Sequence, residues 1–193
     1  MANFYISDTH FGCCNSYENR TLEHDKLIKC NWNTVVTNSD TVYMLGDIGR
    51  IGNNKDNEYL LQILATLKGK KILVVGNHDK LDDARIKQLF TEICNYKEIT
   101  DNVGGKAYKL VLSHYPILMW NGQHKGTIHL YGHTHITEED KFFQDCLTRL
   151  NDYFADKTLK GRTDCPPAKA YNVGAMLIDY TPKTLDKIIG GVQ

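Results

Sequence analysis

The sequence lacks the features that direct a chain to a membrane or to nucleic acid. Its 23 basic residues equal its 23 acidic residues, so no net charge attracts polyanions or an anionic surface. No apolar run approaches the ~20 residues that a membrane-spanning helix needs. The N-terminal stretch MANFYISDTHFG has no basic segment of the kind that opens a secretory signal. We therefore expect a cytoplasmic protein with no membrane partner and no strong nucleic-acid signal, in which any anion is bound by a local site.

The sequence also has no paired CxxC motif, no internal repeat and no low-complexity linker. Six scattered cysteines in a chain without a secretory signal are typical of reduced cytosolic thiols. A chain of 193 residues forms a sizeable core, since a domain near this length buries about 70% of its unfolded surface. We expect a single domain over residues 1–193, with residues 138–169 as a flanking helix and loop.

Short apolar segments rich in Val, Ile, Leu and Tyr alternate with segments of helical periodicity. Strands are predicted at residues 3–7, 41–45, 71–75, 108–113 and 127–131, with a further strand-like stretch at 170–180. Helices are predicted around residues 22–35, 60–67, 82–90 and 138–156, the last with Phe142 and Phe143 on its apolar side. This alternation predicts an α/β fold, α+β in some schemes, and the strand-rich segment 93–131 indicates that the sheet is mixed.

Polar side chains follow each of the five predicted strands where the strand ends. They are Asp8 and His10, Asp47, Asn77 to Asp79, His114, and His133 with His135. Each motif alone is more typical of a surface turn. Because ligands of α/β proteins bind beyond the carboxyl ends of the strands, the five loops are expected to converge on one site.

Seven of these side chains are oxygen or imidazole ligands and none is a thiolate: Asp8, His10, Asp47, Asn77, His114, His133 and His135. Seven exceed what one tetrahedral zinc ion holds, and they suit two borderline divalent ions that share a carboxylate. Residues two apart in an extended segment face the same way, so both D-x-H and H-x-H present paired ligands. Glycines at 46, 76 and 132 directly precede ligand loops, where a missing Cβ leaves room for a sharp turn.

In order and spacing these motifs resemble those of the calcineurin-like metallophosphoesterase superfamily. That family's D-x-H, G-D, G-N-H-[DE], strand-terminal His and G-H-x-H are matched by Asp8/His10, Gly46-Asp47, Gly76–Asp79, His114 and Gly132–His135. The stretches FYISDTHFG and YGHTH resemble its small bacterial and phage branch. The resemblance implies a four-layer αββα sandwich of two mixed sheets, with two divalent transition metal ions at the strand C-terminal ends. Manganese is the leading candidate, with iron, zinc, nickel or cobalt as alternatives.

The resemblance also implies a role for each matched residue. Asp8, His10 and His135 would hold the first ion, Asp47 would bridge to the second, and Asn77, His114 and His133 would complete the second. Asn77 would also contact the substrate, and His78, which is no ligand, would face the phosphate as an acid or charge stabiliser. Protein phosphatases carry an Asp three residues beyond the bridging Asp, but here that residue is Arg50, so Asp79 is expected to orient His78.

The function that the resemblance implies is dinuclear-metal-dependent phosphoester hydrolysis, with in-line attack by a metal-bridging hydroxide. By analogy with other small members, a phosphodiester, nucleotide-like substrate is favoured, and phosphomonoester or nucleotide hydrolysis is the alternative. A non-catalytic scaffold of the same fold is a third hypothesis, which the complete set of ligands disfavours.

A phosphate-contacting His common in the branch is replaced by Cys13. His24, His124 and His129 lie outside the motifs and are expected to be structural or exposed, with His124 the nearest to an exception.

Overall fold

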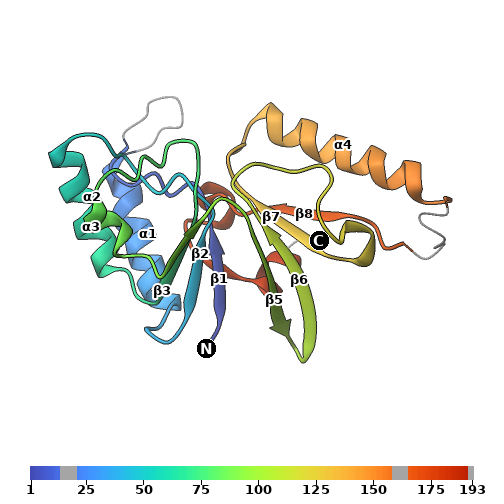
Figure 1. The fold of residues 1–193 in the computed structure, drawn as a ribbon, viewed down its shortest axis with the longest axis horizontal. Helices are drawn as coiled ribbons and strands as arrows, with labels where there is room; N and C mark the ends of the chain where they lie inside the picture. The colour runs from blue at the N-terminus through green and yellow to red at the C-terminus, as the bar shows by residue number, and fades with distance from the viewer. Residues whose placement is uncertain (14–20, 158–164, 191–193) are drawn as a thin grey trace.

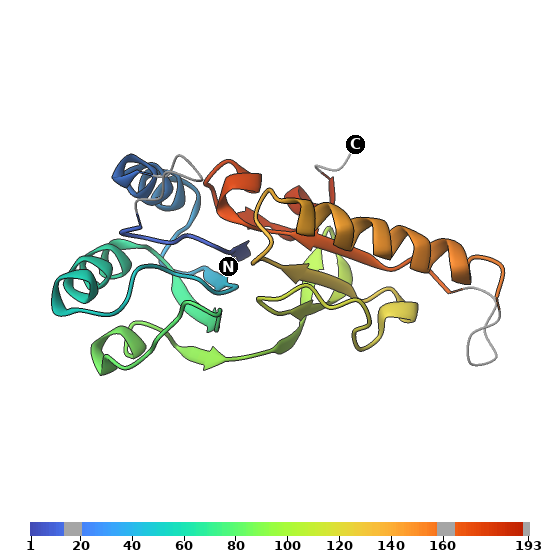
Figure 2. The same ribbon diagram turned by 90° about the horizontal axis from the view of Figure 1, so that it is seen from above.

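A computed structural model of the chain describes residues 1–13, 21–157 and 165–190. Two sheets form its centre (Figures 1 and 2). The first has the order β4-β3-β2-β1-β9 and contains β1 (Asn3–Ile6), β2 (Thr41–Met44), β3 (Lys70–Val74), β4 (Glu92–Cys94) and β9 (Lys183–Thr184). The second has the order β5-β6-β7-β8 and contains β5 (Lys97–Val103), β6 (Lys106–Leu112), β7 (Ile128–Tyr131) and β8 (Lys169–Asn172).

Both sheets are mixed. Strands β1 to β4 are parallel, and β9 is antiparallel to β1. In the second sheet β5 and β6 form an antiparallel hairpin, while β6, β7 and β8 are parallel. A loop with predicted ligands follows the C-terminal end of each of the strands β1, β2, β3, β6 and β7, and these loops can meet at a common site.

Helices cover the outer faces of both sheets, which gives four layers (Figure 1). The first sheet is covered by α1 (Leu22–Val35), α2 (Asn54–Thr66) and α3 (Ala84–Lys87), and the second by α4 (Glu138–Phe154). The remaining elements are α5 (Leu185–Gly190) and the 3-10 helices η1 (Gln123–Lys125) and η2 (Ala175–Ile178).

Alternation along the strands builds the separate hydrophobic layers, because successive side chains of a strand point to opposite faces. In β1, Phe4 and Ile6 pack with the helices α1 and α2, whereas Tyr5 packs between the two sheets. On the far side of the second sheet, Val111 and Tyr131 pack against α4. Strands β1, β2 and β7 are thus largely buried, and the loops at their ends are left to carry polar groups.

The start of α4 is fixed by local sequence. Thr137 is the N-cap, and its hydroxyl accepts a hydrogen bond from the backbone N–H of Glu139. Glu138, Glu139 and Asp140 fill the first turn, where the positive end of the helix dipole favours carboxylates. The helix consequently begins three residues after His135, beside the predicted metal site.

The predicted α/β fold with two mixed sheets is confirmed, with differences in detail. The helix expected over 82–90 is only Ala84–Lys87, and the strand-like stretch 170–180 stops at Asn172 because η2 follows it. Sequence patterns missed β9 and α5. Cys14 and residues 158–164 of the expected flanking loop lie outside the described residues. Within the described ranges, the structure has no helix that combines the length and apolarity needed to cross a membrane.

Candidate metal centre

Five of the seven predicted ligands have a left-handed backbone conformation: Asp8 (φ 54°), His10 (φ 42°), Asp47 (φ 53°), His133 (φ 70°) and His135 (φ 48°). In residues with a Cβ this conformation costs on the order of 1–3 kcal/mol each, and such residues cluster at functional sites. Backbone hydrogen bonds between the loops hold it, including one from the Asp8 N–H to the Gly46 carbonyl of 3.0 Å. The strain turns each loop sharply, so that its side chain faces one common space.

Asp8, His10 and His135 form the first cluster of ligand atoms. The Nε2 atoms of His10 and His135 lie 3.4 Å apart, and the Nε2 of His135 lies 3.7 Å from Oδ1 of Asp8. Two ligands that each lie ~2.1 Å from one ion are separated by roughly 3–4 Å. The spacing of this cluster therefore fits a single divalent ion.

Asn77, His114 and His133 form the second cluster. Oδ1 of Asn77 lies 2.8 Å from Nε2 of His114 and 2.9 Å from Nδ1 of His133. Oδ2 of Asp47 lies between the two clusters, 3.6 Å from Nε2 of His114 and 3.8 Å from Nε2 of His10. The structure thus brings all seven predicted side chains together, and Oδ2 of Asp47 lies within 3.8 Å of a histidine nitrogen in each cluster.

Hydrogen bonds outside the clusters orient the ligand atoms. Nδ1 of His114 lies 2.8 Å from the Leu45 carbonyl oxygen, which can only accept, so a proton on Nδ1 would leave the Nε2 lone pair to an ion. The backbone N–H of His78 donates to Oδ1 of Asp47 at 2.9 Å, which leaves Oδ2 to face both clusters. Asp8 and Asp47 are 2% and 1% exposed, so their negative charges need a positive partner inside the site.

Two glycines are required because the loops approach one another closely. A Cβ on Gly46, which has φ +91°, would lie 2.6 Å from Nδ1 of His114. A Cβ on Gly132 would lie 2.5 Å from Oδ2 of Asp8. Neither distance is tolerated by non-bonded atoms, so a side chain at either position displaces a ligand.

Asp79 holds the backbone of the loop that carries Asp47. Its Oδ2 accepts hydrogen bonds from the N–H groups of Asp47 (2.9 Å) and Gly76 (2.8 Å), and its Oδ1 accepts from Ile48 (2.9 Å). Burial raises the pKa of this carboxyl group. Asp79 therefore positions the loop of Asp47, and its orienting role toward the His78 ring stays a prediction. The His78 side chain is exposed at the rim, with its ring edge-on to that of His10 at 5.8 Å between centroids.

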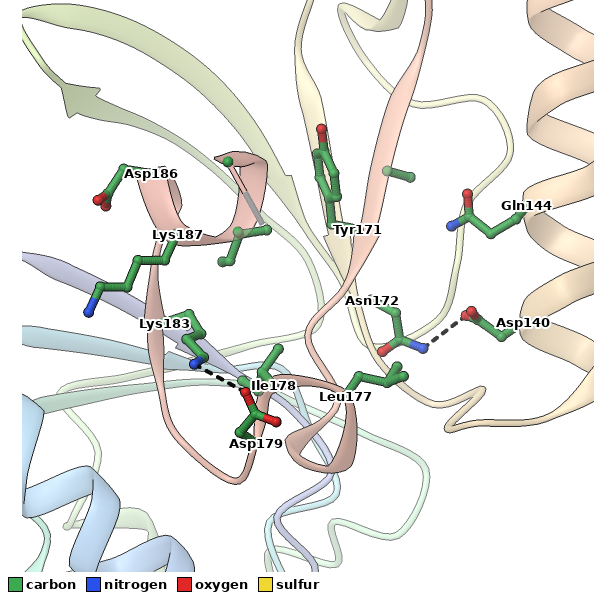
Figure 3. A pocket seen from close by; sticks show the side chains of 13 residues that line it. Asp140, Gln144, Tyr171, Asn172, Leu177, Ile178, Asp179, Lys183, Asp186 and Lys187 are labelled. Atoms are coloured by element: carbon green, nitrogen blue, oxygen red, sulfur yellow. Dashed lines mark hydrogen bonds and ion pairs between the residues drawn. The ribbon is translucent and has the colours of Figure 1, made fainter. Parts of the chain in front are cut away.

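A network that sequence patterns missed fixes the turn between the last two histidines. Oδ1 of Asp140 in α4 accepts hydrogen bonds from the Thr134 hydroxyl (2.7 Å) and the Asn172 amide (2.9 Å). The same Asn172 amide donates to the His135 carbonyl at 3.3 Å. Figure 3 shows Asn172 and Asp140 joined at the wall of a cavity of about 860 Å³ between α4 and the C-terminal segment. An acidic residue in a first helical turn is so common that Asp140 gave no distinct signal.

The other histidines stay outside the metal centre. The His24 ring accepts a hydrogen bond from the Thr21 N–H as part of the cap of α1, and His124 packs edge-on against Phe154. His129 is fully buried, and burial lowers its pKa to about 4.

Arg50, which replaces the acid of protein phosphatases, pairs with Asp56 at 3.1 Å. The Cys13 N–H donates to the His10 carbonyl at 3.0 Å.

Two packed mixed sheets with a cluster of carboxylate, amide and imidazole ligands at the strand ends define a metal-dependent phosphoesterase class of protein. The family model described as calcineurin-like phosphoesterase matches residues 4–164, and the chain belongs to this family. Membership implies metal-dependent phosphoester hydrolysis with divalent metal ions. The donor set of the site fits such ions, because it offers oxygen and nitrogen atoms and no sulfur.

Relatives share this chain over most of its length. The uncharacterized protein MJ1445 of Methanocaldococcus jannaschii is 30% identical over 192 residues, which is 96% of this chain and 88% of the relative. The gene 66 protein of Mycobacterium phage D29 is 29% identical over 159 residues, 70% of this chain and 79% of the phage protein. The crystal structure of AQ665 from Aquifex aeolicus, a protein of unknown function, superposes with a TM-score of 0.68 at 29% identity and covers 99% of both chains.

Proposed function

We propose that the protein is a dinuclear metal-dependent phosphodiesterase. The observation that carries this proposal is the placement of Oδ2 of Asp47 within 3.8 Å of a nitrogen ligand in each of two clusters. One ion would be held by Asp8, His10 and His135, the other by Asn77, His114 and His133, and Asp47 would be shared. If only one ion were bound, the strained backbone at the residues of the other cluster would have no function.

When bound, two divalent ions lower the pKa of a bound water, so that it is a nucleophile near neutral pH, and withdraw negative charge from phosphoryl oxygens. The ligand carboxylates, Asp8 and Asp47, carry two negative charges, fewer than the four positive charges of two such ions. The site therefore stays positive in a chain without net charge, which favours an anionic ester locally.

In this proposal His78 acts on the leaving group. Its backbone is fixed by the bond to Asp47, but its ring is exposed at the rim and is not part of either ligand cluster. A protonated His78 ring would donate its proton to the departing alkoxide oxygen, or stabilise the charge on the transferred group. Asn77, which lies beside it, would contact a phosphoryl oxygen through its amide.

The preference for a diester is supported by the surroundings of the site. A monoester dianion is best bound where Lys or Arg side chains add donors. Among the described residues, the cavity that His133 and Thr134 line is otherwise formed by Tyr115, Pro116, Glu138, Glu139, Phe142 and Phe143, with no Lys or Arg. Such a wall suits an uncharged organic group, such as the second ester group of a diester.

The test is an assay of metal-stripped protein reloaded separately with Mn²⁺, Zn²⁺, Ni²⁺ or Mg²⁺. Bis(4-nitrophenyl) phosphate and 4-nitrophenyl phosphate are compared as substrates. Asp82→Asn, a change at an exposed residue, serves as a control for the effect of a neutral substitution on both activities. We expect metal-dependent hydrolysis with kcat/KM higher for the diester. A higher value for the monoester would support the phosphomonoesterase alternative. Bound metal without hydrolysis of either ester would support the non-catalytic scaffold.

A further inference from the structure

The side-chain amide of Asn172, the last residue of β8, joins two backbone segments that hold ligands of the first cluster. It lies at the wall of the cavity between α4 and the C-terminal segment and points toward Asp140 (Figure 3). Its Oδ1 accepts a hydrogen bond from the Gly174 N–H at 2.9 Å, and its Nδ2 donates to the His135 carbonyl oxygen at 3.3 Å. One planar group therefore connects the segment beside Asp8 with the turn that carries His135.

The partners of this amide determine its orientation. The Gly174 N–H can only donate and the His135 carbonyl can only accept, so the oxygen faces Gly174 and the NH₂ group faces His135. The same NH₂ group lies 2.9 Å from Oδ1 of Asp140, which also accepts from the Thr134 hydroxyl at 2.7 Å. Position 172 thus needs an acceptor and a donor on one short side chain, a combination that Asn provides and Asp lacks.

The segment that follows Asn172 is paired with the residue before Asp8. The Ala175 N–H donates to the Ser7 carbonyl at 2.8 Å, and Ser7 and Gly174 form a parallel β-bridge. Gly174 is so close to the metal centre that a Cβ on it would lie 3.4 Å from Oδ2 of Asp8. The bond from Gly174 to Asn172 therefore acts on the backbone that leads into Asp8.

The second cluster is anchored by other contacts. Nδ1 of His114 lies 2.8 Å from the Leu45 carbonyl oxygen. Oδ1 of Asn77 lies 2.8 Å and 2.9 Å from ring nitrogens of His114 and His133. His114 follows β6 and Asn77 follows β3, whereas Asn172 contacts the turn after β7 and the segment after β8. Loss of the Asn172 amide should consequently affect the first cluster more than the second.

We propose that Asn172 is a positioning residue for the first metal ion. Its amide holds Nε2 of His135 and Oδ1 of Asp8 at their spacing of 3.7 Å, and Asp140 keeps the amide in place. Asn172 acts through the backbone of these two ligands and is not a ligand itself. The inference rests on the proposed function, since it assumes that an ion binds among Asp8, His10 and His135. Partners that orient metal ligands typically contribute about 10–100-fold to metal affinity.

The experiment titrates metal-stripped protein with Mn²⁺ by calorimetry and locates the ions by anomalous diffraction. We expect Asn172→Ala to raise the dissociation constant of the first ion about 10–100-fold and that of the second by less than about 3-fold. Asn151→Ala is the matched control. Asn151 also connects α4 to β8, through bonds of 2.8 Å and 3.0 Å to the backbone of Ala168, but near the end of α4 that is remote from His135. The control should unfold at a lower urea concentration and keep both ions.

A second variant separates positioning from a simple link between α4 and β8. When Asn172→Asp is combined with Asp140→Asn, the bond between positions 140 and 172 can form again with donor and acceptor exchanged. The new carboxylate still cannot donate to the His135 carbonyl. We expect this double variant to unfold at a higher urea concentration than Asn172→Asp alone, while its first ion stays about 10-fold or more weaker than in the wild type.

Four results would overturn the assignment. They are an unchanged first ion in Asn172→Ala, equal weakening of both ions, full recovery of the first ion in the double variant, and the same loss in Asn151→Ala. A wild type that binds one ion only, among Asp8, His10 and His135, would contradict the dinuclear function alone, and weaker binding of that ion in Asn172→Ala would still support the assignment. A wild type with no ion at this position would overturn both.

Discussion

Replacing Asp79 by Asn tests whether this carboxylate holds the Asp47 loop. The carboxylate accepts three backbone N–H groups, from Asp47, Ile48 and Gly76, at 2.8–2.9 Å. An Asn side chain of the same shape has one oxygen in place of two. If that oxygen keeps the two bonds made by Oδ2, the amide NH₂ group faces the Ile48 N–H, and two donors oppose each other.

The magnitude follows from these contacts. An orphaned buried donor costs about 1–3 kcal/mol, and two bonds to a charged acceptor become bonds to a neutral one, which weakens each by about 1 kcal/mol. We therefore expect Asp79→Asn to lower the free energy of unfolding of the metal-free protein by about 3–5 kcal/mol. Because the displaced backbone carries Asp47, we also expect weaker metal binding.

The assay is urea unfolding followed by circular dichroism, with Asp82→Asn as the matched control. Asp82 is an exposed carboxylate three positions along the same segment, so its replacement should change the free energy of unfolding by less than about 0.5 kcal/mol. Should Asp79→Asn unfold at the same urea concentration as the control and keep its metal affinity, Asp79 does not position the loop.

Three further predictions concern single residues. Asp47→Asn should lower the metal content measured by mass spectrometry below two ions per chain, because an amide cannot neutralise two cations; an unchanged content at unchanged affinity would show that Asp47 is not shared. His78→Ala should keep its metal and lose ~10²–10⁴-fold in kcat on alkyl esters but less on nitrophenyl esters; an equal loss on both would make His78 a charge stabiliser, and loss of metal would make it a ligand. His129 has a pKa lowered from 6.5 to about 4, so the unfolded chain takes up its proton first as pH falls from 6.5 to 4. Over that window His129 should reduce the free energy of unfolding by about 3 kcal/mol relative to His129→Gln; parallel pH profiles of the two proteins would contradict this.

The convergence of the predicted ligand residues could be foreseen because each motif is short, contiguous and directly follows a strand. Asp8 with His10 and His133 with His135 could be recognised as pairs by their spacing, but a left-handed backbone, and not the extended segment assumed from the sequence, brings each pair to the site. The strained backbone at these residues is the price of such sharp loops, and it appears only in three dimensions.

What could not be predicted depends on contacts between distant segments. Asp79 meets backbone groups 31 and 32 residues away, and Asn172 meets Asp140 across 32 residues. Hydrophobic periodicity placed Phe142 with Phe143 on the apolar side of α4, but Phe142 is exposed and only Phe143 is buried. Adjacent residues of a helix point about 100° apart, so where the core contact is narrow only one of them is buried, and the sequence alone does not show which.

The number and position of bound ions test the central claim most directly. Anomalous diffraction from crystals of Mn²⁺-loaded protein should show two peaks that share Oδ2 of Asp47, one among Asp8, His10 and His135, the other among Asn77, His114 and His133. A single peak in the metal-loaded crystal, or an ion held by a cysteine, would contradict the account.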